Sequence, residues 1–184
     1  MNIFKAMILT GHEILNNVKN KNIHIVPFDK SLLNPNSYDY RMDYKLLELV
    51  DLPVDPKKQT SYNEINFTDE GYILSPHRTY LANTYEEIGS DVFVPSLIGK
   101  TSLGRLGLFL QITADLGNLG AKHKWTLELK VVQPIKIYPM MKIGQVTFWS
   151  TSGESNMKYK GKYDKFSVAK SSEIYKEFIK DDGV

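Results

Sequence analysis

Short apolar runs, separated by turn residues, recur along most of the chain. Many of them contain β-branched or aromatic residues, which favour β-strands, and each is bounded by polar, glycine or proline positions. This pattern predicts an all-β barrel or sandwich that carries only minor helices. The runs are Ile23–Val26, Tyr38–Met42, Gly71–Leu74, Thr79–Ala82, Val92–Val94, Phe109–Ile112, Trp125–Leu129, Ile135–Ile137 and Gln145–Trp149.

Helical signals lie near the two ends of the chain. Thr10 and Glu13 have the spacing of a capping box ahead of an amphipathic stretch, which predicts a helix over about residues 11–19. The tail, residues 172–180, is compatible with a second helix. Residues 51–70 are polar and contain two prolines, and we interpret them as a loop or a long hairpin arm.

Composition narrows the class of protein. The chain has 184 residues, of which 42% are hydrophobic and 24% charged, as in an ordinary globular domain. A net charge of +2 without a basic block does not favour nucleic acid as a partner, and no run approaches the ~20 apolar residues of a membrane span. The sequence has no cysteine, which excludes disulfides, thiol nucleophiles and Cys-ligated zinc. We expect a cytoplasmic protein, prokaryotic or phage-encoded, without a secretory signal or membrane partner.

Residues 99–107 concentrate the candidate chemistry. This segment, Gly-Lys-Thr-Ser-Leu-Gly-Arg-Leu-Gly, combines glycines, hydroxyls and two cations. Glycines let backbone N–H groups approach an anion, and the cations supply charge for a polyphosphate. Glu128 follows as a lone carboxylate in a strand-like run, where burial would be costly unless the group is paired or used. Together they suggest a nucleotide-phosphate cradle with a general base behind it.

Simpler interpretations of the same residues stay open. The segment is not a P-loop, because the G-x-x-x-x-G-K-[ST] pattern is absent, and it can be a plain turn between strands. Strand alternation can equally place Glu128 on the surface. The histidines have no familiar metal-ligand spacing, and no nucleophile elbow occurs, so neither a metal site nor a serine hydrolase is predicted. These histidines are His12, His24, His77 and His123.

Several motifs in order resemble the dCTP deaminase family within the dUTPase-like superfamily. Residues 99–108 are similar to the family signature Gly-Arg-Ser-Ser-x-x-Arg-x-Gly-Leu, and Thr-Leu-Glu at 126–128 follows at the family's spacing. The other similar segments are residues 7–14, 25–28, 34–41, 113–114, 138–145 and 161–163.

The resemblance implies one domain over residues 1–184 with a flexible C-terminal flap at about 155–184. The implied fold is mainly β, a distorted β-barrel of the dUTPase-like, β-clip type with a few short helices. Such domains assemble as homotrimers with active sites between subunits, so a second copy of the chain is an expected partner beside the nucleotide.

The resemblance also implies a metal-free hydrolytic deamination of dCTP to dUTP and ammonia. Glu128 would be the general base, Thr101 and the Ala114 carbonyl would hold the attacking water, and Arg105 would stabilise charge and orient Glu128. Mg²⁺ would enter bound to the triphosphate, with no catalytic metal on the protein. The implied nucleotide-binding residues are Lys100, Ser102, Gly104, Asn118, Thr126, Leu127, Tyr159 and Lys162.

Two alternative functions remain. The signature is shared with dUTP or dCTP diphosphatases and with bifunctional deaminases of the same fold, so the motifs do not separate them. The chain also departs from the family pattern: it has Asp115-Leu116 where the family usually has His-Arg, and the flap lacks the expected Gln-x-Gln-x-Gly. These departures motivate a non-catalytic nucleotide sensor or protein-binding homologue. A trimeric dUTPase proper is disfavoured, because its Ile-Asp-x-x-Tyr motif is missing near residues 116–123.

Overall fold

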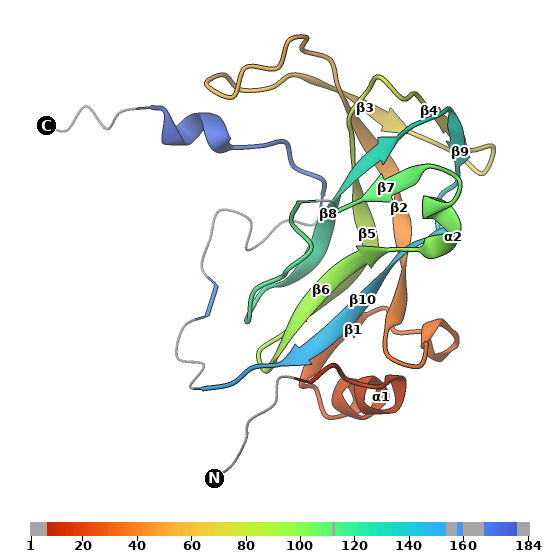
Figure 1. The fold of residues 1–184 in the computed structure, drawn as a ribbon, viewed down its shortest axis with the longest axis vertical. Coiled ribbons are helices and arrows are strands. Elements are labelled where there is room, and N and C mark those ends of the chain that lie inside the picture. The colour runs from red at the N-terminus through yellow and green to blue at the C-terminus, as the bar shows by residue number, and fades with distance from the viewer. Residues whose placement is uncertain (1–6, 112, 154–157, 160–167, 180–184) are drawn as a thin grey trace, which may run out of the picture.

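Antiparallel strands form almost all of the regular structure in a computed structural model that describes residues 7–111, 113–153, 158–159 and 168–179 (Figure 1). Within these ranges an eight-stranded sheet has the order β6-β10-β2-β5-β8-β7, with β1 paired to β5 and β3 to β2, and β4 pairs with β9 in a separate ribbon. The strands are β1 (Ile23–Val26), β2 (Tyr38–Leu49), β3 (Tyr62–Asn66), β4 (Tyr72–Leu74), β5 (Tyr80–Ser90), β6 (Phe93–Gly99), β7 (Leu108–Leu110), β8 (Lys122–Val131), β9 (Ile135–Ile137) and β10 (Lys142–Ser150).

The sheet curls until its two ends meet. β6 and β7 stand at opposite ends of the strand order, yet a side chain added at Gly99, the last residue of β6, would contact Leu110 of β7. Register shifts where β2 meets β10 and where β5 meets β8 bend the long strands, as bulges do in barrels. The prediction of a mainly β, barrel-like fold is therefore confirmed.

Alternating apolar positions of the long strands fill the interior. Tyr38, Tyr40 and Met42 on β2 are fully buried, and so are Leu127 and Leu129 on β8. Spacing of two places these side chains on one face of their strand, so the core follows directly from the sequence pattern. Within the described ranges no helix is long and apolar enough to cross a membrane.

The N-terminal helix forms where the capping box predicts it. α1 spans Gly11–Lys19, and the Glu13 backbone N–H donates to Thr10 Oγ1 at 3.3 Å. A hydroxyl at the N-cap satisfies one of the donors that a first helical turn leaves unpaired. The other helical elements are short turns: η1 (Lys30–Leu32), α2 (Thr101–Gly104) and η2 (Ile174–Glu177).

Of two further predicted segments, one is confirmed and one is wrong. The segment 51–70 takes the hairpin-arm alternative rather than the plain loop, because β3 within it pairs with β2. Its residues are mostly exposed and polar, so backbone pairing rather than burial holds it as a strand. The tail forms only the short turn η2 instead of a helix over 172–180, and Lys180 lies outside the described residues. Strands β2, β5 and β8 are longer than the apolar runs that predicted them, because their pairing with neighbouring strands continues beyond those runs.

Candidate active site

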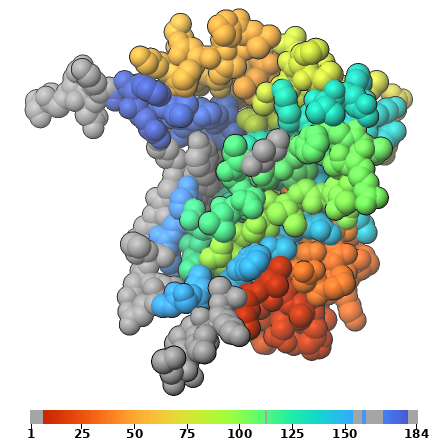
Figure 2. Space-filling model, in the orientation of Figure 1, coloured from red at the N-terminus to blue at the C-terminus, as the bar shows by residue number. Residues whose placement is uncertain are grey.

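A cavity of about 550 Å³ opens beside β8. Its walls come from β8, the loop that follows β7, the arm between β2 and β3, and the C-terminal segment 168–179. Figure 2 shows that this C-terminal segment (dark blue) lies against the arm (orange), where the Lys57 ammonium stands 5.8 Å from the centre of the Phe178 ring. Segments far apart in the sequence thus enclose one space, large enough for a small organic ligand.

Glu128 faces this cavity because of its position in the strand. Leu127 and Leu129 point into the core, so the alternation of β8 sends the intervening carboxylate to the opposite face, where it lines the cavity. Thr113 Oγ1 donates a hydrogen bond to Glu128 Oε2 at 3.3 Å. The carboxylate is exposed to solvent, so a ligand can reach it.

Gln111 is a residue of this site that the sequence analysis did not identify. Its Oε1 accepts the Glu128 backbone N–H at 2.9 Å, and its Nε2 donates to the Ala114 carbonyl at 3.3 Å. The side chain is buried and lines the cavity. The signal in the sequence was a single amide inside the apolar run 108–112, since a buried amide needs hydrogen-bond partners.

Four of the other predicted residues also line the cavity. Ala114, Asn118, Thr126 and Tyr159 lie around it together with Glu128. Thr126 Oγ1 accepts the Lys170 backbone N–H at 3.4 Å, which ties the C-terminal segment to β8. The Tyr159 backbone N–H donates to the Leu119 carbonyl at 2.9 Å.

Two more of the predicted nucleotide-binding residues are Leu127 and Lys162. Leu127 has no exposed surface, because its side chain belongs to the core and its backbone is covered as well, so the prediction that it contacts a nucleotide is wrong for the chain in this structure. Lys162 lies outside the described residues.

An aromatic pair forms part of the cavity wall. The rings of His123 and Trp125 have centroids 4.5 Å apart, and both residues line the cavity. Trp125 Nε1 donates to the Ile88 carbonyl at 2.9 Å, which fixes the indole in place. This part of the wall offers aromatic surface to the same cavity that Glu128 lines.

The glycine-rich segment lies apart from this cavity. Among the described residues that line it, none comes from 99–107. Figure 1 shows α2 on the right of the barrel and the C-terminal segment that lines the cavity on the left. Thr101, Ser102 and Arg105 are exposed, and Gly104 has no atom within 4 Å of where a Cβ would stand. Within one chain, therefore, the predicted cradle and the predicted base are separate.

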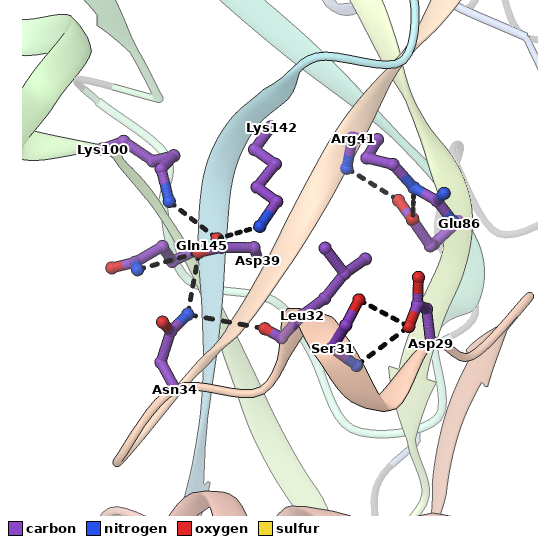
Figure 3. Close-up of polar contacts among 10 residues, drawn as sticks. All are labelled: Asp29, Ser31, Leu32, Asn34, Asp39, Arg41, Glu86, Lys100, Lys142 and Gln145. Atoms are coloured by element: carbon purple, nitrogen blue, oxygen red, sulfur yellow. Dashed lines mark hydrogen bonds and ion pairs between the residues drawn. The ribbon is translucent and has the colours of Figure 1, made fainter.

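Lys100, the residue that precedes α2, is held by the buried carboxylate of Asp39 on β2. Lys100 Nζ lies 2.8 Å from Asp39 Oδ2, and Asp39 Oδ1 accepts hydrogen bonds from Asn34 at 2.8 Å and Gln145 at 3.0 Å (Figure 3). Lys142 Nζ stands 3.8 Å from the same carboxylate.

These partners decide the ionisation of Asp39. Burial by itself would raise the pKa of Asp39, but the hydrogen bonds from Lys100, Gln145 and Asn34 outweigh it, so the pKa lies below its usual range. The charge of Lys100, expected at the phosphates, is therefore already paired with an ionised carboxylate.

The loop between β7 and β8 is attached to β6 on its other side. The Leu97 backbone N–H donates to the Asp115 carbonyl at 2.7 Å, and Ser96 Oγ donates to Asp115 Oδ2 at 3.2 Å. Leu116 forms an isolated bridge with Ser96 and lines the cavity. The Asp115-Leu116 pair, which departs from the family pattern, thus fastens the loop that carries Ala114.

Comparison with known proteins identifies the family to which this barrel belongs. The sequence model of a family described as dCTP deaminase-like matches residues 8–151, which include the whole barrel. The chain belongs to the dCTP deaminase-like family.

Individual members of the dCTP deaminase-like family match nearly the whole chain. A protein of Hathewaya histolytica named dCTP deaminase, dUMP-forming, is 41% identical over 172 residues, covering 94% of this chain and 99% of the relative. A protein of the same name from Leptospira biflexa is 40% identical over 174 residues, covering 95% and 99%. These names carry dUMP as the product, so they do not support the sequence-based expectation of dUTP.

A solved structure of the dCTP deaminase-like fold also aligns with this chain. The 2′-deoxycytidine 5′-triphosphate deaminase of Agrobacterium tumefaciens superposes with a TM-score of 0.64 at 19% identity. The alignment covers 79% of this chain and 49% of that chain. At this identity the likeness shows the fold, which is the same barrel.

Proposed function

We propose that this member of the dCTP deaminase-like family deaminates dCTP and also releases pyrophosphate, so that its product is dUMP. The observation that carries the proposal is the pair formed by the Glu128 carboxylate and the Ala114 carbonyl on the wall of one cavity, joined through Gln111. Two relatives that match almost end to end bear the name dUMP-forming, which supports the second step. In total, dCTP and two waters give dUMP, ammonia and pyrophosphate.

In the proposed deamination, Glu128 takes a proton from a water that the Ala114 carbonyl holds. The water oxygen attacks C4 of cytosine, and Glu128 passes the proton to N3, giving a tetrahedral intermediate. The C4–N bond then breaks, and the amino group leaves as ammonia with the second proton of the water. Thr113, which donates to Glu128, fixes the orientation of the carboxylate before attack.

The site is completed by a neighbouring copy of the chain in this proposal. Thr101, Ser102 and Arg105 face solvent on a side of the barrel that also exposes apolar residues. Val132 packs beside Gly107 at the end of the glycine-rich segment, which places an apolar patch next to these polar groups. Docking of this patch in a homotrimer brings Thr101 and Arg105 to the Glu128 of the neighbour. The exposed apolar residues are Leu106, Phe109 and Val132.

Magnesium enters this proposal with the substrate. Among the described residues, no three His, Asp or Glu side chains gather into a metal-binding set. In this proposal Mg²⁺ binds the phosphate oxygens of the triphosphate, as it does in many nucleotide enzymes, and the deamination chemistry belongs to Glu128.

The test is a product analysis with purified protein, dCTP and Mg²⁺, in which chromatography resolves nucleotides while ammonia and pyrophosphate are assayed. We expect dUMP, ammonia and pyrophosphate in equal amounts. Accumulation of dUTP would reduce the function to deamination alone, and pyrophosphate without ammonia would make the protein a diphosphatase. Nucleotide binding without any turnover would instead support a sensor.

A substitution connects the activity to the site. Glu128→Gln removes the base but keeps the size of the side chain, so we expect ammonia release to fall by about 10³-fold while calorimetry still detects dCTP binding. Glu64→Gln is the matched control, because Glu64 is an exposed carboxylate on β3 that does not line the cavity. Full activity of the Glu128 variant would contradict the proposal.

A further inference from the structure

The side-chain amide of Gln111 joins two segments that approach the cavity from different directions. Its oxygen accepts the backbone N–H of Glu128 on β8, and its nitrogen donates to the carbonyl of Ala114 in the loop after β7. A carboxamide is a planar group with an acceptor on one side and a donor on the other. Gln111 therefore fixes the spacing between these two backbone positions.

The backbone of Gln111 is unusual for its residue type. Its φ is 50°, in the left-handed region that residues other than glycine seldom adopt. Only 8% of the residue is exposed, so the side chain has little freedom to swing away. Strained conformations of this kind persist where the surroundings enforce them, and they cluster at functional sites.

The loop that carries Ala114 is held on two sides. The hydrogen bonds from Leu97 and Ser96 to Asp115 hold its outer side to β6. Gln111 holds its inner side to β8. With both in place, the Ala114 carbonyl keeps a fixed position relative to the backbone from which the Glu128 carboxylate extends, although the two residues lie on different elements.

We infer that Gln111 is a positioning residue for the proposed deamination: its amide sets the Ala114 carbonyl and the Glu128 carboxylate to bind one water between them. The inference rests on the proposed function and deepens it. The Ala114 carbonyl oxygen has two lone pairs, so it accepts from Gln111 and still has one for the water. A positional error of about 1 Å between such groups costs on the order of 10²-fold in rate.

The test separates positioning from binding. Gln111→Met keeps the length of the side chain and removes both hydrogen bonds. We expect kcat for ammonia release to fall by about 30-fold, while KM for dCTP and the Kd of dUMP by calorimetry change less than about 3-fold. Gln111→Glu keeps an oxygen for the Glu128 N–H but, when ionised, offers the Ala114 carbonyl no donor, so kcat falls with this variant too.

Controls distinguish the possible outcomes. Asn17→Ala removes another side-chain hydrogen bond to a backbone carbonyl, that of Glu13 in α1, and we expect it to leave kcat within about 2-fold. Thermal melting verifies that each variant is folded, and Gln111→Glu is the variant measured if Gln111→Met does not fold. A Gln111 variant with unchanged kcat, or with a raised KM alone, overturns the assignment. Wild-type protein that does not deaminate dCTP contradicts the proposed function itself and this inference with it.

Discussion

At the scale of single residues, Asp39 illustrates how one buried carboxylate connects separate segments. It lies on β2 and accepts from Asn34 before that strand, from Gln145 on β10 and from Lys100 at the start of α2 (Figure 3). Only 6% of its side chain is exposed, so the cost of removing the charge from water is met by these partners. Asp39 thus anchors Lys100, the residue that precedes α2, to the interior of the barrel.

Replacing Asp39 is predicted to destabilise the protein. Asp39→Asn leaves Lys100 without its counter-charge, and we expect the free energy of unfolding in urea to fall by about 3 kcal/mol at neutral pH. Glu64→Gln removes the exposed ion pair with Lys45 and should cost less than about 0.5 kcal/mol. Equal effects of the two substitutions on the free energy of unfolding would show that burial of the Asp39–Lys100 pair makes no difference to stability.

The contribution of Asp39 is also predicted to depend on pH. Its pKa is lower in the folded than in the unfolded chain, so its stabilisation is complete above the unfolded pKa and is lost as the pH falls through the folded value. The difference in unfolding free energy between wild type and Asp39→Asn should therefore be constant above about pH 5 and shrink below about pH 4. If the difference in unfolding free energy grew as the pH falls, this would contradict a lowered pKa for Asp39 in the folded chain.

At the scale of elements, close pairing of β5 with β8 determines where Glu128 and the cavity lie. Gly89 of β5 pairs with Lys122 at the beginning of β8. A Cβ at Gly89 would overlap the Ala121 carbonyl oxygen, so only glycine allows the strands to approach here. The register of the two strands shifts between Asn83 and Glu87 of β5, and His123 and Trp125 in the same part of β8 line the cavity.

Gly89→Ala is predicted to separate these strands locally and lower stability by about 2 kcal/mol or more, measured by chemical denaturation. Gly99→Ala is the control, because the added methyl group would make only an ordinary contact with Leu110 and the backbone φ is not positive. The control should stay within about 0.5 kcal/mol of wild type. Equal stability of the Gly89 variant would show that the strands can move apart without cost.

At the scale of the whole molecule, the barrel separates the glycine-rich segment from Glu128. Within one chain, Glu128 and Ala114 line the cavity, while Thr101 and Arg105 are exposed at the two ends of α2, on another side of the barrel. A chain with these two half-sites on different faces suits a symmetric assembly in which each interface completes one site.

This arrangement predicts that two inactive variants complement each other. Glu128→Gln and Arg105→Ala homotrimers should both be inactive, whereas subunits mixed in equal amounts should regain about a quarter of the wild-type activity, because that fraction of interfaces pairs an intact Glu128 with an intact Arg105. A mixture of Glu128→Gln with Glu128→Ala should stay inactive. Mass determination by light scattering checks the trimer, and failure of the first mixture to recover activity would contradict shared sites.

The sequence by itself determined most of the strands and the family resemblance. Alternation with a period of two is a local property, so it predicted the buried faces of β2 and β8 and, with the capping residue Thr10, the helix α1. It left β3 open between a loop and a hairpin arm, because that strand is polar and exists through its hydrogen bonds to β2.

Tertiary structure alone decided how the candidate residues are grouped. The closeness of Glu128 to Ala114 depends on a bridge by Gln111, and the pairing of Lys100 with Asp39 joins residues 61 positions apart. Such contacts depend on how the sheet curls and closes, and no local pattern encodes that geometry. The same closure places Glu128 and the glycine-rich segment, which follow one another in the sequence, on different faces of the barrel.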